Sequence, residues 1–101
     1  MDVIFEEIQE DVLIWAGERG LLNEENSGKQ LLKTVSEVGE LADAFIKVDD
    51  EEIVDAIGDV VVCLTILAEQ LDLDIVGCFE VAYEVIKDRS GQTVDGVFIK
   101  E

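Results

Sequence analysis

The chain has 101 residues, a length that predicts one domain over residues 1–101. Its 25 Asp and Glu against 7 Lys and Arg give a formal net charge of −18, which argues against nonspecific binding to nucleic acid or to an anionic membrane. A hydrophobic content of 49% excludes an ordinary disordered acidic tail, and the absence of His excludes imidazole bases and histidine zinc ligands.

Apolar residues recur at helical spacing along most of the chain, and Pro is absent. This pattern predicts an all-α, four-helix bundle followed by a short extended C-terminal tail. The expected helices cover residues 2–18, 27–47, 53–71 and 74–88, and the tail covers residues 90–101. The predicted helix caps are Ser27, in a capping box with Gln30, then Asp49 or Asp50, and finally Asp72 or Asp74.

Each expected helix carries an apolar face. The first has a stripe of Ile4, Ile8, Val12 and Trp15, which we expect to pack in the core. The third is apolar on nearly every side over residues 59–68, which is typical of the middle of a bundle or of a subunit interface. We therefore expect a homo-oligomer, either a dimer or a tetramer.

The chain lacks the signals of export and membrane insertion. Its start is acidic rather than basic, and the apolar run at residues 60–64 is far too short to span a bilayer. We therefore expect a cytoplasmic protein without a membrane partner. Cys63 and Cys78 have apolar neighbours and are expected to be reduced, buried thiols.

Two pairs of carboxylates lie on the expected second and third helices. Glu37 and Glu40 are three residues apart, and Asp55 and Asp59 are four apart, so each pair shares a helix face. A short connection makes the helices antiparallel neighbours, and the pairs then differ in height by only about 2 Å. Four facing carboxylates repel one another unless a cation neutralises them, and oxygen-only ligands suit Mg²⁺ or Mn²⁺.

Two glycines sit beside these acids in the middle of helices. Gly39 precedes Glu40 and Gly58 precedes Asp59, and an interior helical Gly costs about 1 kcal/mol relative to Ala. A close approach of the two helices, or clearance for a ligand, would explain them.

The segments Ser-Glu-Val-Gly-Glu-Leu at 36–41 and Asp-Ala-Ile-Gly-Asp-Val at 55–60 resemble the MazG-like all-α nucleoside triphosphate pyrophosphohydrolases. The ending, at 87–91 and 96–100, resembles the short, phage-type single-domain members. The family pattern is Glu-Glu-x-x-Glu followed by Glu-x-x-Asp. Ser36 and Ala56 depart from it, while Glu52 and Asp55 match Glu-x-x-Asp literally.

The resemblance implies an enzyme that hydrolyses a (deoxy)nucleoside triphosphate to the monophosphate and pyrophosphate. It implies Mg²⁺ held by Glu37, Glu40, Asp55 and Asp59, with Glu37 or Glu40 also acting as the base toward water. The candidate cations for the triphosphate are Lys33, Lys87, Arg89 and Lys100. For Lys33, an ion pair with Glu37 is an equal alternative.

Two readings without catalysis stay open. An acidic protein of this size could mimic nucleic acid and occupy a basic groove on a partner, or it could serve as a helical adaptor. The mimic requires carboxylates spread over the exposed surface, and it leaves Asp59 within an apolar helix unexplained.

Overall fold

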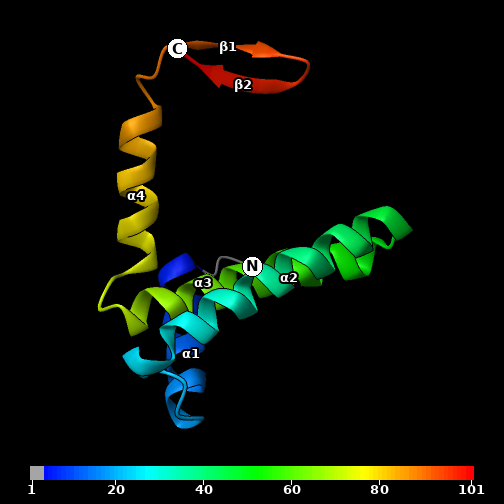
Figure 1. Ribbon diagram of the computed structural model, residues 1–101. Helices are drawn as coiled ribbons and strands as arrows, with labels where there is room; N and C mark the ends of the chain where they lie inside the picture. Colours follow the sequence, from blue (N-terminus) through cyan, green and yellow to red (C-terminus); the bar gives the residue numbers. More distant parts are fainter. Residues whose placement is uncertain (1–3) are drawn as a thin grey trace.

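The computed structural model describes residues 4–101 (Figure 1). Its elements are α1 (Phe5–Glu18), the short 3₁₀ helix η1 (Glu24–Asn26), α2 (Ser27–Lys47), α3 (Asp50–Gln70), α4 (Ile75–Ile86), β1 (Gly91–Val94) and β2 (Val97–Lys100). The predicted all-α chain with four helices and a short extended tail is confirmed. The third helix begins three residues earlier than expected, at Asp50, and the predicted first-helix residues 2 and 3 lie outside the described part.

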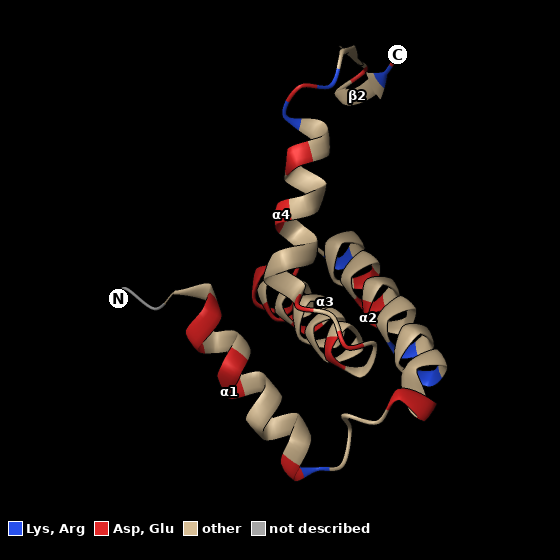
Figure 2. Ribbon diagram, turned by 90° about the vertical axis from the view of Figure 1, so that its left-hand side faces the viewer, with Lys and Arg blue, Asp and Glu red and all other residues tan. Residues whose placement is uncertain are grey.

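The helices α1, α3 and α2 lie side by side in that order, with α3 in the middle (Figure 2). A two-residue connection makes α2 and α3 antiparallel, and the Gln30 side chain donates to the Cys63 carbonyl across them at 3.1 Å. Ala44 of α2 and Ala56 and Ile66 of α3 are buried. We call residues 4–71 the body.

α4 and the hairpin stand away from the body, as Figure 1 shows. The hairpin pairs β1 with β2 in antiparallel register, from Gly91 opposite Lys100 to Val94 opposite Val97. We call residues 75–101 the arm. None of its residues is buried, so the fourth helix covers little of the core in a single chain.

The predicted caps of α3 and α4 are confirmed. The Asp49 side chain accepts from the Glu52 amide at 3.1 Å, and the Asp74 side chain accepts from the Gly77 amide at 3.0 Å. The predicted Ser27 cap is wrong, because η1 runs directly into α2 and Ser27 is already helical.

Three helices end in the same Schellman arrangement, in which an amide beyond the helix bonds back to a carbonyl in its last turn. These bonds run from Leu21 to Ala16 at 3.0 Å, from Asp49 to Ala44 at 3.1 Å and from Leu73 to Ala68 at 2.8 Å. The arrangement needs one left-handed residue. It is Gly20 after α1, but Val48 (φ 56°) after α2 and Asp72 (φ 59°) after α3. A β-branched Val in this conformation is strained.

Several expectations about burial are wrong for a single chain. Trp15 is 46% exposed, and the Arg19 guanidinium stacks on its ring at 4.3 Å. Cys63 is buried as predicted, but Cys78 is exposed on α4. No large side chain among residues 4–101 is fully buried. The apolar stripes exist, but one copy of the chain does not cover them.

No helix within residues 4–101 combines the length and the apolar character needed to cross a bilayer.

Candidate functional site

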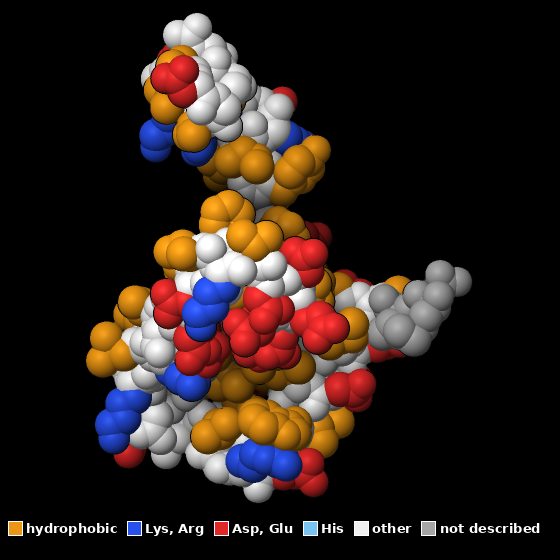
Figure 3. Space-filling model, turned by 90° about the vertical axis from the view of Figure 1, so that its right-hand side faces the viewer, with side chains coloured by type: hydrophobic (Ala, Val, Ile, Leu, Met, Phe, Trp, Pro, Cys, Tyr) orange, Lys and Arg blue, Asp and Glu red, His pale blue; other side chains and the backbone are white. Residues whose placement is uncertain are grey.

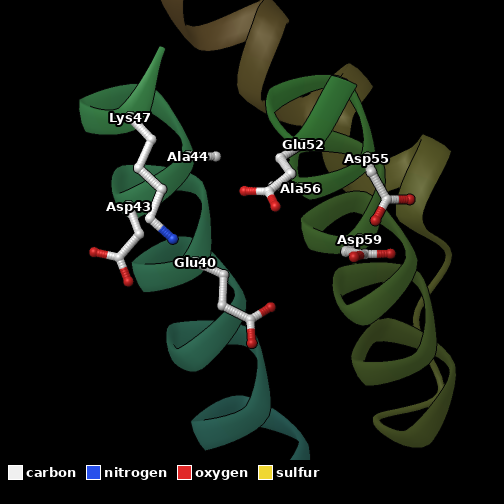
Figure 4. Close-up of a pocket in the computed structure, with 8 residues that line it drawn as sticks. All are labelled: Glu40, Asp43, Ala44, Lys47, Glu52, Asp55, Ala56 and Asp59. Carbon is white, nitrogen blue, oxygen red and sulfur yellow. The ribbon is translucent and has the colours of Figure 1, made fainter. Parts of the chain in front are cut away.

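A groove of about 280 Å³ between α2 and α3 brings together three of the four predicted metal ligands (Figure 4). Its lining is Glu40, Asp43, Ala44 and Lys47 from α2, and Glu52, Asp55, Ala56 and Asp59 from α3. Antiparallel packing therefore brings five carboxylates from two helices to one groove. Figure 3 shows the acidic side chains gathered on one face of the molecule, with basic side chains around them.

Glu37 lies on α2 one turn before Glu40 and is only 6% exposed. One of its oxygens, Oε1, is 3.0 Å from Lys33 Nζ, so the i,i+4 ion pair that was the equal alternative for Lys33 is present. The other, Oε2, is buried and has no hydrogen-bond partner. A buried carboxylate oxygen without a donor is costly, so a cation or a donor that satisfied it would stabilise the fold.

The carboxylates around Glu37 influence one another. The hydrogen bond from Lys33 holds the pKa of Glu37 below its usual value. The Glu37 carboxylate, which would accept a hydrogen bond from protonated Glu40, and the repulsion by its charge raise the pKa of Glu40. Burial raises the pKa of Asp59, and the charges of Asp55 and Glu37 raise it further. The cluster therefore resists carrying all of its negative charges at once.

Three of the four predicted ligands, Glu40, Asp55 and Asp59, line the groove, and Glu37 lies beside it. In Figure 4 the Glu40 carboxylate points toward α3, whereas that of Asp55 is turned away from α2. Asp55 also lines a second groove, on the α1 side of α3.

Sequence reasoning gave too little weight to Glu52 and missed Asp43. The Glu52 carboxylate points across the groove toward α2 (Figure 4), one turn before the buried Ala56. Glu52 therefore supplies a carboxylate near the position where the MazG-like pattern has Glu and this chain has Ala. The literal Glu-x-x-Asp match at 52–55 was the signal for it.

The donor chemistry fits Mg²⁺ or Mn²⁺, because carboxylate oxygens are the ligands that these hard cations prefer. The unpartnered Glu37 Oε2 fits a site that a cation would complete. Within residues 4–101, however, no three acidic or thiol side chains are grouped closely enough to hold an ion as they stand. Binding would require rotation of side chains such as those of Glu40 and Glu52.

The predicted phosphate-binding cations fall into two groups. Lys33 lies beside the groove through its pair with Glu37, and Lys47, which the sequence reasoning missed, lines it. Lys87, Arg89 and Lys100 lie on the arm, at the outer end of α4 and in the tail (Figure 2). Lys87 pairs there with Glu84 at 2.8 Å. Within one chain, these three cations are remote from the carboxylates.

A second, apolar groove of about 520 Å³ runs between α1 and α3. Its lining is Phe5, Ile8, Gln9 and Val12 from α1, and Val54, Asp55, Gly58, Asp59, Val61, Val62 and Thr65 from α3. Asp55 and Asp59 line both grooves, so the two are neighbours. A Cβ added at Gly58 or at Gly39 would meet no atom within 4 Å, which rules out close helix approach as the reason for either Gly.

The chain is 38% identical over 60 residues to an uncharacterized 18.2 kDa protein from the rep-hol intergenic region of Haemophilus phage HP1. The match covers 59% of this chain and only 37% of the phage protein. No protein-family model and no solved structure matches the chain. The resemblance to MazG-like enzymes therefore stays a prediction.

Proposed function

We propose that the protein hydrolyses a (deoxy)nucleoside triphosphate to the monophosphate and pyrophosphate, with Mg²⁺ as cofactor and Mn²⁺ as a possible substitute. The observation that supports this most is the buried, unpartnered Glu37 Oε2 beside a groove lined by carboxylates of two helices. A merely solvated acidic face would leave no carboxylate oxygen buried without a partner.

Glu37, Glu40, Asp55 and Asp59 would hold the cation, with Glu52 as an additional donor. When bound, Mg²⁺ would neutralise the phosphate oxygens and the charge that develops during displacement. Lys33 and Lys47 add positive charge on the α2 side of the groove.

The reaction that we propose is attack of water on the α-phosphorus. The bond from this phosphorus to the bridging oxygen breaks, and pyrophosphate leaves with the bonding electrons. Glu37 or Glu40 takes the proton from the attacking water. These two side chains lie one turn apart on α2, so either can reach the same side of the groove.

A panel of ribonucleoside and deoxynucleoside triphosphates with Mg²⁺, scored for pyrophosphate against orthophosphate, tests the proposal. We expect pyrophosphate from at least one substrate, and no product when EDTA is present. Absence of turnover of every triphosphate, with Mg²⁺ and with Mn²⁺, would refute it.

An acidic binding protein is the second candidate. The gathering of exposed carboxylates on one face in Figure 3 favours it, because such a face could enter a basic groove of a partner. This reading predicts no turnover, and binding to a basic partner that weakens steeply as salt is added.

We also propose that the chain forms a homo-oligomer, a dimer or a tetramer. Large apolar side chains are exposed on every helix, including Phe5, Ile8, Leu32, Phe45, Val54 and Phe79. A second copy would cover part of this surface. Light scattering at micromolar concentration tests the assembly, and a mass of one chain would contradict it.

A further inference from the structure

The arm carries a large apolar surface that its own chain leaves uncovered. Phe79 is 68% exposed, and Val81 and Val85, on the same helix, are also exposed. Phe79 and Val81 are two residues apart and so point to different sides of α4. An α-helix with apolar side chains on several sides is stable in water only when other elements cover it.

Hydrogen bonds hold the three residues before the arm, 72–74, which we call the root. The Leu73 amide bonds back to the Ala68 carbonyl at 2.8 Å, which fixes the end of α3. The Asp74 side chain accepts from the Gln9 side chain of α1 and from the Gly77 amide of α4. These contacts tie the body, the root and the first turn of α4 together. Folding the arm back over residues 4–71 of the same chain would break these contacts, so the body of the same chain does not cover α4.

The apolar groove between α1 and α3 matches the arm in size and chemistry. Its apolar side chains come from both helices, and the empty space above Gly58 leaves room for an incoming side chain. α4 has 12 residues and is about 18 Å long, while α1, with 14 residues, is about 21 Å long. α4 of a second copy could therefore lie along α1 over most of its length.

The arm is less acidic than the body, with five Asp and Glu against three Lys and Arg, and its cations lie beyond α4 rather than along it. The arm holds three of the seven Lys and Arg, namely Lys87, Arg89 and Lys100. In contrast, 20 of the 25 Asp and Glu precede residue 75. Asp55 and Asp59 stand on the side of the apolar groove that adjoins the carboxylate groove. The side chains of Lys87, Arg89 and Lys100 would be attracted to this rim.

We propose that the arm of one copy docks in the α1–α3 groove of a second copy, so that Lys87 and Arg89 reach the second copy's carboxylate groove. The apolar side chains of α4 fill the groove, and the hairpin at residues 91–100 extends over its acidic rim. Each carboxylate groove then contains Lys and Arg side chains from the other copy. The assignment of these cations to the triphosphate rests on the proposed function, whereas the docking itself does not.

Zero-length cross-linking of Lys to carboxylates, in a mixture of isotopically labelled and unlabelled chains, tests the docking without any need for activity. We expect cross-links between chains that join Lys87 or Lys100 to Glu52, Asp55 or Asp59. Lys29, an exposed body residue, serves as the control and should form no such link to these acids. Two outcomes would overturn the proposal. In one, arm residues are linked to the body only within the same chain; in the other, the links between chains involve no arm residue.

A paired substitution tests whether α4 drives the assembly. Phe79→Glu with Val81→Glu alters only exposed side chains, so the helical circular dichroism signal should persist while the mass from light scattering falls to that of one chain. Ile46→Glu changes an equally exposed apolar residue of α2 outside the groove and should leave the assembly intact. Assembly that survives the double substitution would contradict the docking.

The outcomes separate the docking from the proposed function. Chains that cross-link through the arm but turn over no triphosphate would support docking and refute the function. A monomeric chain with turnover would refute docking, and NMR shifts of its groove residues on nucleotide addition would assign the groove to the nucleobase. If both proposals hold, neither the Asp59→Asn variant nor the Lys87→Gln/Arg89→Gln variant should turn over substrate alone. A mixture of the two should recover turnover, because the intact arm of the first variant docks on the intact carboxylates of the second.

Discussion

Lys33 Nζ lies 3.0 Å from Glu37 Oε1, while the other oxygen of the same carboxylate is buried without a partner. Lys33 is largely exposed and Glu37 is buried, so the pair joins a solvated cation to a desolvated anion. Lys33 therefore neutralises Glu37 from the solvent side, and the buried Oε2 is left without a hydrogen-bond donor. This arrangement distinguishes Glu37 from the acids that line the groove.

Replacing Lys33 by Met should destabilise the fold at neutral pH, because Glu37 would keep its charge without a partner. The lowered pKa of Glu37 means that the pair's contribution is lost as the pH falls through that pKa. The raised pKa of Lys33 means that it is also lost above that pKa at strongly alkaline pH. Urea unfolding across pH measures the difference from wild type, which should vanish at both extremes. Lys29→Met, on the same helix, should show no such pattern.

Asp59→Asn should make the metal-free protein more stable. The pKa of Asp59 is raised by burial and by neighbouring charges, so its charged form destabilises the fold above that pKa. The gain should therefore be present at neutral pH and fade in acid. The substitution should also weaken the stabilisation that Mg²⁺ gives by binding only the folded state. Thermal melts with and without Mg²⁺ measure both effects; lower stability with an unchanged Mg²⁺ shift would remove Asp59 from the site.

Glu52→Gln should lower turnover and reduce the Mg²⁺-induced rise in melting temperature, because the Glu52 carboxylate points across the groove. Glu51→Gln changes the adjacent residue, which does not line the groove, and should leave both quantities at their wild-type values. If Glu51→Gln lowered turnover and the Mg²⁺-induced rise in melting temperature as much as Glu52→Gln, Glu52 would act only through the net charge of the protein.

Val48→Asn should stabilise the protein by about 1 kcal/mol, because Asn adopts the left-handed conformation with less strain than a β-branched residue. Val48 is exposed, so little packing is lost. Val48→Gly should also stabilise, but by less, since Gly gains entropy in the unfolded chain. Chemical denaturation measures the change. A loss of stability in both variants would contradict the claim that Val48 is strained.

Gly58→Ala and Gly39→Ala form a matched pair. Each Gly is inside a helix with free space where a Cβ would stand, so each substitution should stabilise the fold by about 1 kcal/mol. Only Gly58 lines the α1–α3 groove, so only Gly58→Ala should weaken docking or ligand binding there. Melting temperature together with light scattering distinguishes the two; identical behaviour would leave Gly58 without a role in the groove.

The helices could be predicted from the sequence because periodicity and caps are local properties. Asp49 and Asp74 are caps that the chain specifies within one turn. Ser27 was misjudged because η1 continues into α2, which a capping pattern does not reveal. Burial could not be predicted, since an apolar stripe such as that of α4 does not say which chain covers it.

The sequence was sufficient to predict which helix faces carry the site residues. The short connection between α2 and α3 set the relative heights of Glu40 and Asp59, and both line the groove. Side-chain direction lies beyond such reasoning. It decides that Glu52 points across the groove and that Asp55 turns away from α2 (Figure 4).

The central claim is that the carboxylates between α2 and α3 support release of pyrophosphate. Phosphorus NMR of a triphosphate that the wild-type protein consumes with Mg²⁺ tests it most directly, with Asp59→Asn and the exposed α3 variant Glu69→Gln measured alongside. We predict monophosphate and pyrophosphate from wild type and from Glu69→Gln, and no product from Asp59→Asn. Diphosphate with orthophosphate as products, or full activity of Asp59→Asn, would contradict the claim.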